Sequence, residues 1–146
     1  MERHLFTVGY EGRSVESFID TLNANAVSHL IDVREIPLSR KKGFSKAALR
    51  EHLIRNNIGY THIKDLGSPR QARKQLKETG NYKVFFDAME QHLSQVHDSV
   101  RQAYQYVAEN TCCLMCFEKE AQNCHRSMVA RKIKEVDGNS LSIKHL

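Results

Sequence analysis

The sequence has no long apolar run, no internal repeat and no linker-like or low-complexity tract. Its apolar runs are far shorter than the ~20 residues that a helix needs to span a bilayer. The segment Met1–Tyr10 also lacks the long apolar centre of a secretory signal peptide. We therefore expect the 146 residues to form one domain, residues 1–146, with a cytoplasmic location and no membrane partner.

Cysteine is also scarce, and its spacing argues against a disulfide framework. Three of the four cysteines (Cys112, Cys113 and Cys116) lie within five positions on one expected strand, where side chains are poorly placed to bridge each other. The sequence predicts a reduced protein, in which Cys112 and Cys113 are buried and unreactive. Cys116 and Cys124 are expected to stay reduced and to lie near each other, with one of them unusually reactive.

The net charge of +5 is concentrated in one segment. Residues 34–55 contain seven basic and two acidic side chains (7 − 2 = +5), and Arg70, Arg73, Lys74 and Lys77 form a second basic cluster. This asymmetry suggests an anionic partner, either a phosphorylated small molecule or nucleic acid, and a solvated basic face is the equal alternative. The sequence contains no helix-turn-helix or ribonucleoprotein signature.

Apolar periodicity predicts strands that alternate with helices. The expected strands are His4–Val8, Ser28–Val33, Gly59–Ile63, Thr111–Cys116 and Ser140–His145. Helices are expected after Ser14, Ser45, Ser68-Pro69 and Asn81, with a break near His97-Asp98, and over Ser127–Val136. This alternation predicts an α/β fold, doubly wound, with a mostly parallel sheet of about five strands and helices on both faces.

In such a sheet the loops that follow the strands open on the carboxyl edge, where ligands usually bind. The loops after the first, second and fourth strands concentrate polar and reactive side chains. We expect the candidate catalytic residues to be Cys116, Glu118, Asp32, Cys124 and His125, and the candidate ligand-binding residues to be Tyr10, Arg34, Ser39, Arg40 and Arg126. No cofactor is predicted.

Three chemistries fit these residues. The first is nucleophilic or redox chemistry by Cys116 or Cys124, because a helix N-terminus and a neighbouring arginine favour the thiolate. The second is acid–base catalysis by Asp32 and Glu118 on a ligand whose phosphate is held by arginines. The third is a zinc site made by Cys116, Cys124 and His125, although their spacing is not that of a zinc finger and a fourth ligand, such as His62 or Glu118, is needed.

Several segments together resemble the family of domain of unknown function 488. They are Thr7–Ser14, Ile31–Arg34 with Pro37–Arg40, Gly43–Ser45, Leu66-Gly67, and Cys116–Lys119 with Cys124–Arg126, and they cover essentially the whole chain in order. The resemblance implies a small α/β domain with a presumed activity. It also implies that the motif residues of the family are Asp32, Arg34, Arg40, Glu118, Arg126, Cys116 and Cys124.

Two further interpretations remain open. Leu30–Glu35 is similar to a rhodanese strand, and a cysteine follows a later strand, so sulfur transfer is an alternative; the loop after that strand is longer and more acidic than in rhodaneses. The chain is alternatively a non-catalytic module that binds nucleic acid or a protein partner through its basic segment, with Phe44 and Tyr60 near enough in sequence for stacking.

Overall fold

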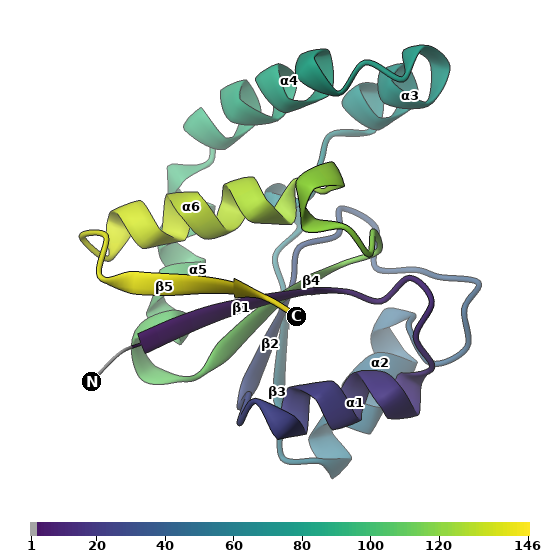
Figure 1. The fold of residues 1–146 in the computed structure, drawn as a ribbon, viewed down its shortest axis with the longest axis vertical. Helices are drawn as coiled ribbons and strands as arrows, with labels where there is room; N and C mark the ends of the chain where they lie inside the picture. Colours follow the sequence, from purple (N-terminus) through teal and green to yellow (C-terminus); the bar gives the residue numbers. More distant parts are fainter. Residues whose placement is uncertain (1–2) are drawn as a thin grey trace.

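The computed structural model describes residues 3–146, which contain one sheet with helices on both faces (Figure 1). All five strands are parallel and lie in the order β3-β2-β4-β1-β5. The strands are β1 (Arg3–Gly9), β2 (His29–Asp32), β3 (Gly59–His62), β4 (Cys112–Cys116) and β5 (Leu141–His145). The predicted doubly wound α/β architecture is therefore confirmed.

The direction of each crossover decides which face its helix covers. The chain moves from β1 to β2 and then to β3 in one direction along the sheet, and it returns through β4 to β5 in the other. Because parallel crossovers are right-handed, the two directions place their helices on opposite faces. One face is covered by α1 (Val15–Ala24) and α2 (Lys46–Arg55), and the other by α4 (Tyr82–Ser94), α5 (His97–Glu109) and α6 (Arg126–Val136) (Figure 1).

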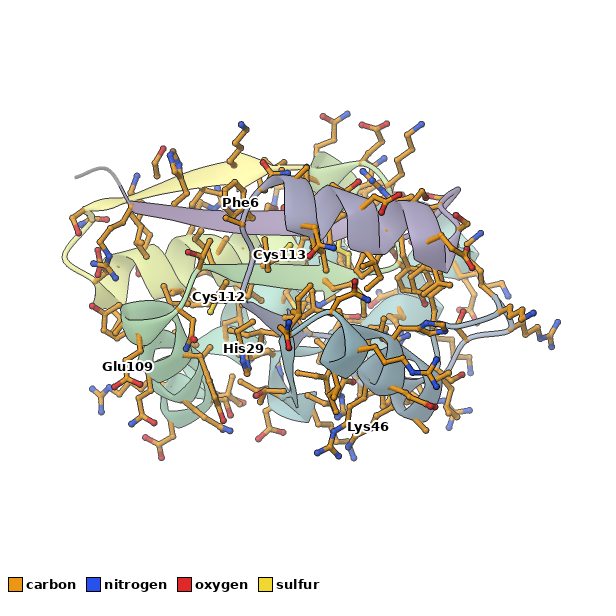
Figure 2. The ribbon with its side chains drawn as sticks, turned by 90° about the horizontal axis from the view of Figure 1, so that it is seen from below. Phe6, His29, Lys46, Glu109, Cys112 and Cys113 are labelled. Carbon is orange, nitrogen blue, oxygen red and sulfur yellow. A yellow bond between two sulfur atoms is a disulfide. The ribbon has the colours of Figure 1, made fainter. Side chains whose placement is uncertain are left out.

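Strand β4 lies in the middle of the sheet and is buried along its whole length. Its side chains alternate between the faces, so Cys113 and Met115 pack with the α1–α2 core while Cys112, Leu114 and Cys116 pack with the α4–α6 core. Cys112 and Cys113 are completely buried inside these two cores (Figure 2), and burial raises the pKa of the Cys112 thiol to about 12. The prediction that both are buried is confirmed.

Between β3 and β4 the chain forms an extension rather than a single crossover helix. A short 3-10 turn, η1 (Lys64–Leu66), leads to α3 (Arg70–Thr79), and α3 packs against α4 at the edge of the molecule (Figure 1). The long helical pattern that begins after Asn81 divides into α4 and α5, as the sequence predicted, with the break at Gln95 and Val96. None of the helices in residues 3–146 is long and apolar enough to cross a membrane.

Strand β4 is also the switch point of the fold, because its neighbours β1 and β2 both lead to helices on the face opposite to α6. Crevices at the carboxyl edge of α/β sheets form at such points. The loop after β4 crosses directly over the end of β1, where a Cβ atom on Gly9 would lie 1.7 Å from the carbonyl oxygen of Glu118. Only glycine leaves space for that approach, so Gly9 fixes where the reactive loop passes.

Candidate functional site

A cavity of about 620 Å³ opens at this carboxyl edge. Its walls come from the loops after β1, β2 and β4 and from α3 and the start of α4. Seven of the ten predicted site residues line it, namely Tyr10, Arg34, Ser39, Cys116, Glu118, Cys124 and His125. The other three, Asp32, Arg40 and Arg126, are not among its lining residues.

Cys116 and Cys124 are joined by a disulfide, which corrects the expectation that both stay reduced. They are close because the loop after β4 folds back on itself. A short 3-10 turn, η2 (Ala121–Asn123), brings the main-chain N–H of Cys124 to the carbonyl oxygen of Ala121 and delivers Cys124 to the end of β4. The predicted proximity of the two sulfurs is confirmed, and both cysteines are almost completely buried in the wall of the cavity.

His125 is fixed in one orientation beside Cys124. Its Nε2 lies 2.8 Å from the carbonyl oxygen of Val33, which only accepts hydrogen bonds, so Nε2 carries the proton. In the neutral ring Nδ1 is then unprotonated, and it lies 3.7 Å from Sγ of Cys124. Burial lowers the pKa of His125 to about 4, so the ring is neutral at pH 7. The carbonyl group of Val33, directly after β2, thus holds His125 with Nδ1 towards Cys124.

This burial predicts a loss of stability in acid. The pKa of His125 falls from about 6.5 in the unfolded chain to about 4 in the folded chain, so the unfolded state binds more protons between these values. Stability is fully present above pH ~6.5 and is lost as the pH falls through 4, by up to about 3 kcal/mol. Urea unfolding from pH 7.5 to 4 should show this slope in the wild type and a smaller slope in His125→Gln. An unchanged slope in the variant would assign the effect to His29 or His145, whose pKa values burial also lowers.

Arg126 was predicted to bind a ligand, and the structure places it differently. The side chain is completely buried, and its donors face the protein. Nε donates to the Thr7 hydroxyl at 3.1 Å, Nη1 to the carbonyl oxygen of Glu118 and to Sγ of Cys116 at 3.1 Å, and Nη2 to the carbonyl oxygen of Lys119 at 3.2 Å. Arg126 therefore fastens the loop after β4 to β1 and supplies positive charge beside Cys116.

Asp32 was predicted as an acid–base residue, and in the structure it binds Arg34 and Tyr60. It is completely buried, and Oδ1 accepts from the main chain and Nε of Arg34 at 3.1 and 2.9 Å. Oδ2 accepts from Nη2 of Arg34 and from the Tyr60 hydroxyl, both at 2.6 Å. These four contacts occupy the acceptor sites of the carboxylate. Asp32 thus holds Arg34 against the cavity, where Nη1 reaches the carbonyl oxygen of Phe44 at 2.7 Å.

Arg40 and Ser39 belong to the loop between β2 and α2. Ser39 lines the cavity and organises this loop, because its hydroxyl accepts from the main chain of Lys41 at 3.1 Å and its own N–H donates to the Ser45 hydroxyl at 2.9 Å. Arg40 is exposed and lies outside the cavity lining, so the ligand-binding role expected for it stays a prediction.

Glu118 is exposed on the rim of the cavity, and desolvation within its loop raises the pKa of its carboxyl group. A carboxylate oxygen of Glu118 and the sulfurs of Cys116 and Cys124 lie within 4.8 Å of one another, which is the spacing of a metal site. The disulfide removes both thiolates from that set, and one carboxylate does not make a zinc site. His62, the other ligand considered, instead contacts the carbonyl oxygen of Arg34 at 2.6 Å.

Part of the cavity comes from residues that the sequence did not assign to the site. Arg73 and Lys77 of α3 form a basic wall, and Arg73 pairs with Glu35 at 2.8 Å. A Cβ atom on Gly67 would lie 2.2 Å from the main-chain nitrogen of Glu35, so this glycine lets the segment before α3 pass close to the loop after β2. The basic cluster on α3 was visible in the sequence, but its position beside the thiols was not.

The lining of the cavity also includes apolar side chains that are unusually exposed. These side chains are large and lie 43–69% exposed, and they are Ile36, Leu38, Tyr82 and Phe117. Beneath them Tyr10 is stacked on Phe44 with ring centroids 4.5 Å apart, and the ring of Phe117 meets Tyr10 edge-on at 5.4 Å. The site therefore combines a rigid aromatic floor with a solvent-facing apolar wall.

The fold and the cavity define a small doubly wound α/β protein with a cysteine–histidine loop at the carboxyl edge of its sheet. The family model described as "Domain of unknown function DUF488" matches residues 14–133, and the chain belongs to this family. No curated protein and no solved structure matches the chain significantly. The resemblance found from the motifs is thus confirmed.

Proposed function

We propose that the protein is a thiol-dependent enzyme that acts on an anionic, phosphate-bearing ligand in the cavity. The observation that carries the proposal is the fixed tautomer of His125, whose unprotonated Nδ1 lies 3.7 Å from Sγ of Cys124. Cys124 is the nucleophile and His125 is its general base. The main-chain N–H of Arg126 donates to the same sulfur at 3.4 Å, so the first turn of α6 stabilises negative charge there.

The timing of the proton transfer follows from burial. Because the pKa of His125 is lowered to about 4, a resting thiolate–imidazolium pair is unfavourable. The proton of the Cys124 thiol therefore moves to Nδ1 as the sulfur attacks, which is general base catalysis. The attack of the sulfur breaks the bond between the electrophilic atom of the ligand and its leaving group. Glu118 lies on the rim of the cavity, desolvation raises the pKa of its carboxyl group, and this group donates a proton to the leaving group.

The disulfide is the resting oxidised form in this proposal. Two equivalents of a thiol reductant convert it to the Cys116 and Cys124 thiols and are themselves oxidised to a disulfide. In the reduced form the Arg126 guanidinium, 3.1 Å from Sγ, favours the Cys116 thiolate. The anion of the ligand meets Arg73 and Lys77 on the α3 wall.

Alkylation kinetics test the nucleophile and its base. After reduction, Cys124 should react with iodoacetamide at pH 7 far faster than Cys112 or Cys113, which serve as buried internal controls. His125→Gln should slow the modification of Cys124 by about 100-fold, the lower end of the range for general base catalysis. Mass spectrometry of tryptic peptides measures each site separately.

The outcome decides the proposal in both directions. Protection of Cys124 by inorganic phosphate or a nucleotide would support a ligand beside the thiol. If Cys124 is alkylated at the same rate in the wild type and in His125→Gln, His125 is not its base. If Cys124 reacts no faster than a cysteine in an unfolded peptide, its thiol is not activated.

A further inference from the structure

The cavity lies between two basic surfaces, and of their side chains the proposed chemistry uses only Lys77. On one side, the loop after β2 continues from Leu38 and Ser39 in the cavity wall directly into the first surface, made by Arg40, Lys41, Lys42, Lys46 and Arg50. Lys46 and Arg50 are one turn apart on the outer face of α2, and Lys46 lies at the surface of the molecule (Figure 2). On the other side, α3 presents Arg70, Lys74 and Lys77 to solvent.

These eight cations are not neutralised by the protein. Within residues 3–146, none of them takes part in an ion pair, whereas Arg34, Arg55 and Arg73 are paired with Asp32, Glu51 and Glu35. The acidic side chains near them include Glu78 on α3, Glu118 on the rim, and Glu35 and Glu51, which are paired with Arg73 and Arg55. The charge on both sides of the cavity therefore exceeds what one phosphate group of about two charges needs.

The apolar wall indicates what lies between these charges. Ile36, Leu38 and Phe117 are exposed around an opening of about 620 Å³, which is large enough for a planar base and its sugar. Aromatic and apolar side chains stack on unpaired bases irrespective of their sequence. A duplex cannot place a base in such a cavity without flipping it out, which costs a few kcal/mol.

We propose that the occupant is a single-stranded nucleic acid, with one unstacked nucleotide in the cavity and the flanking phosphates on the two basic surfaces. The proposal deepens the proposed function, because it places this substrate class at the same thiol site. The phosphates on one side of this nucleotide lie along the surface made by α2 and the loop after β2. The phosphates on its other side lie along α3, and either polarity of the strand fits. A mononucleotide fills the cavity but leaves the basic side chains of both surfaces unoccupied, except Lys77.

Fluorescence anisotropy with a labelled 12-nucleotide single strand of mixed sequence tests this inference with the intact chain. Its affinity should fall steeply with KCl, with a slope near −3 in log–log form if about four phosphates are contacted. A blunt duplex of the same sequence should bind at least 10-fold more weakly, and AMP should compete only at far higher concentration. DNA and RNA strands of the same sequence show which of the two nucleic acids the protein prefers, because only RNA carries the 2′-hydroxyl group.

Two sets of variants separate charge from stacking. Lys42→Ala with Lys46→Ala, both exposed and outside the cavity, should reduce the salt slope by about one unit and leave thermal stability unchanged. Leu38→Ala with Phe117→Ala should weaken binding by at least 10-fold without changing the slope, because stacking is worth about 1–3 kcal/mol per base. Lys83→Ala with Lys132→Ala, on α4 and α6, is the matched control and should bind like the wild type.

Several results would overturn the inference. Equal affinity for duplex and single strand, or full binding by the Leu38 and Phe117 variant, would show that no base enters the cavity. Binding of AMP as tight as that of the 12-mer would reduce the substrate to a mononucleotide. The proposed function fails separately, if Cys124 is unreactive in a protein that still binds the single strand as described.

Discussion

Replacing Arg126 with alanine is expected to lower the free energy of unfolding by about 3 kcal/mol. The change leaves the carbonyl oxygens of Glu118 and Lys119 and the hydroxyl of Thr7 without their donor, and each unsatisfied group costs roughly 1–3 kcal/mol when it is buried. The Thr7 hydroxyl is buried, whereas the two carbonyl oxygens are partly buried. Burial also lowers the pKa of Arg126, so part of the gain from these bonds already offsets the desolvation of the charge. We therefore expect a loss of stability near the lower end of the summed costs of these unsatisfied groups.

Thermal melts with the reduced protein measure this loss. For a chain of this size about 3 kcal/mol corresponds to a decrease in Tm of roughly 6–12 °C. Arg126→Lys is the matched control: it keeps the charge but not the planar fork, so it should recover only part of the loss. A Tm of Arg126→Ala within 2 °C of the wild type, together with weaker binding of phosphate ligands, would return Arg126 to the ligand-binding role that the sequence suggested.

The contrast between Arg126 and Arg34 shows what the sequence could and could not provide. Both follow strands at the carboxyl edge, and this position alone places them near the site. Which of them reaches the cavity depends on contacts between elements far apart in the chain. Gly9 lets the loop after β4 lie over β1, and that crossing draws the guanidinium of Arg126 inward to Thr7. The periodicity of apolar residues in the sequence does not indicate that this loop and β1 lie close together.

The elements themselves were more accessible to prediction, because each carries its own local signal. Ser14 accepts from the main chain of Ser17 and begins α1, and the alternation of the β4 side chains between the two faces of the sheet separates Cys113 from Cys116. The disulfide was not predicted, because strand geometry forbids bridges within β4 but says nothing about a partner that returns eight residues later through η2. The α3 wall was missed for a similar reason, since amphipathic spacing does not say where a helix docks.

The second large effect is expected at the buried pair of Asp32 and Arg34. Asp32→Ala should lower the free energy of unfolding by about 3–5 kcal/mol, because it leaves the guanidinium of Arg34 buried without its carboxylate. The Tyr60 hydroxyl also loses its acceptor, at 2.6 Å. This desolvated pair should be worth far more than the exposed pair of Glu51 and Arg55 on α2, where Glu51→Ala should cost less than 1 kcal/mol.

A double-mutant cycle measures how much of the cost of Asp32→Ala arises because the Arg34 guanidinium is left buried and unpaired. Arg34→Met keeps most of the side-chain volume and removes the cation, so the double variant with Asp32→Ala buries no unpaired charge. We expect urea unfolding to show the double variant at least 2 kcal/mol more stable than the sum of the single effects requires. Additive effects would mean that the two side chains act independently. Because Arg34 also lines the cavity, the double variant should fold and yet bind phosphate ligands less tightly, which separates its support of the fold from its place in the site.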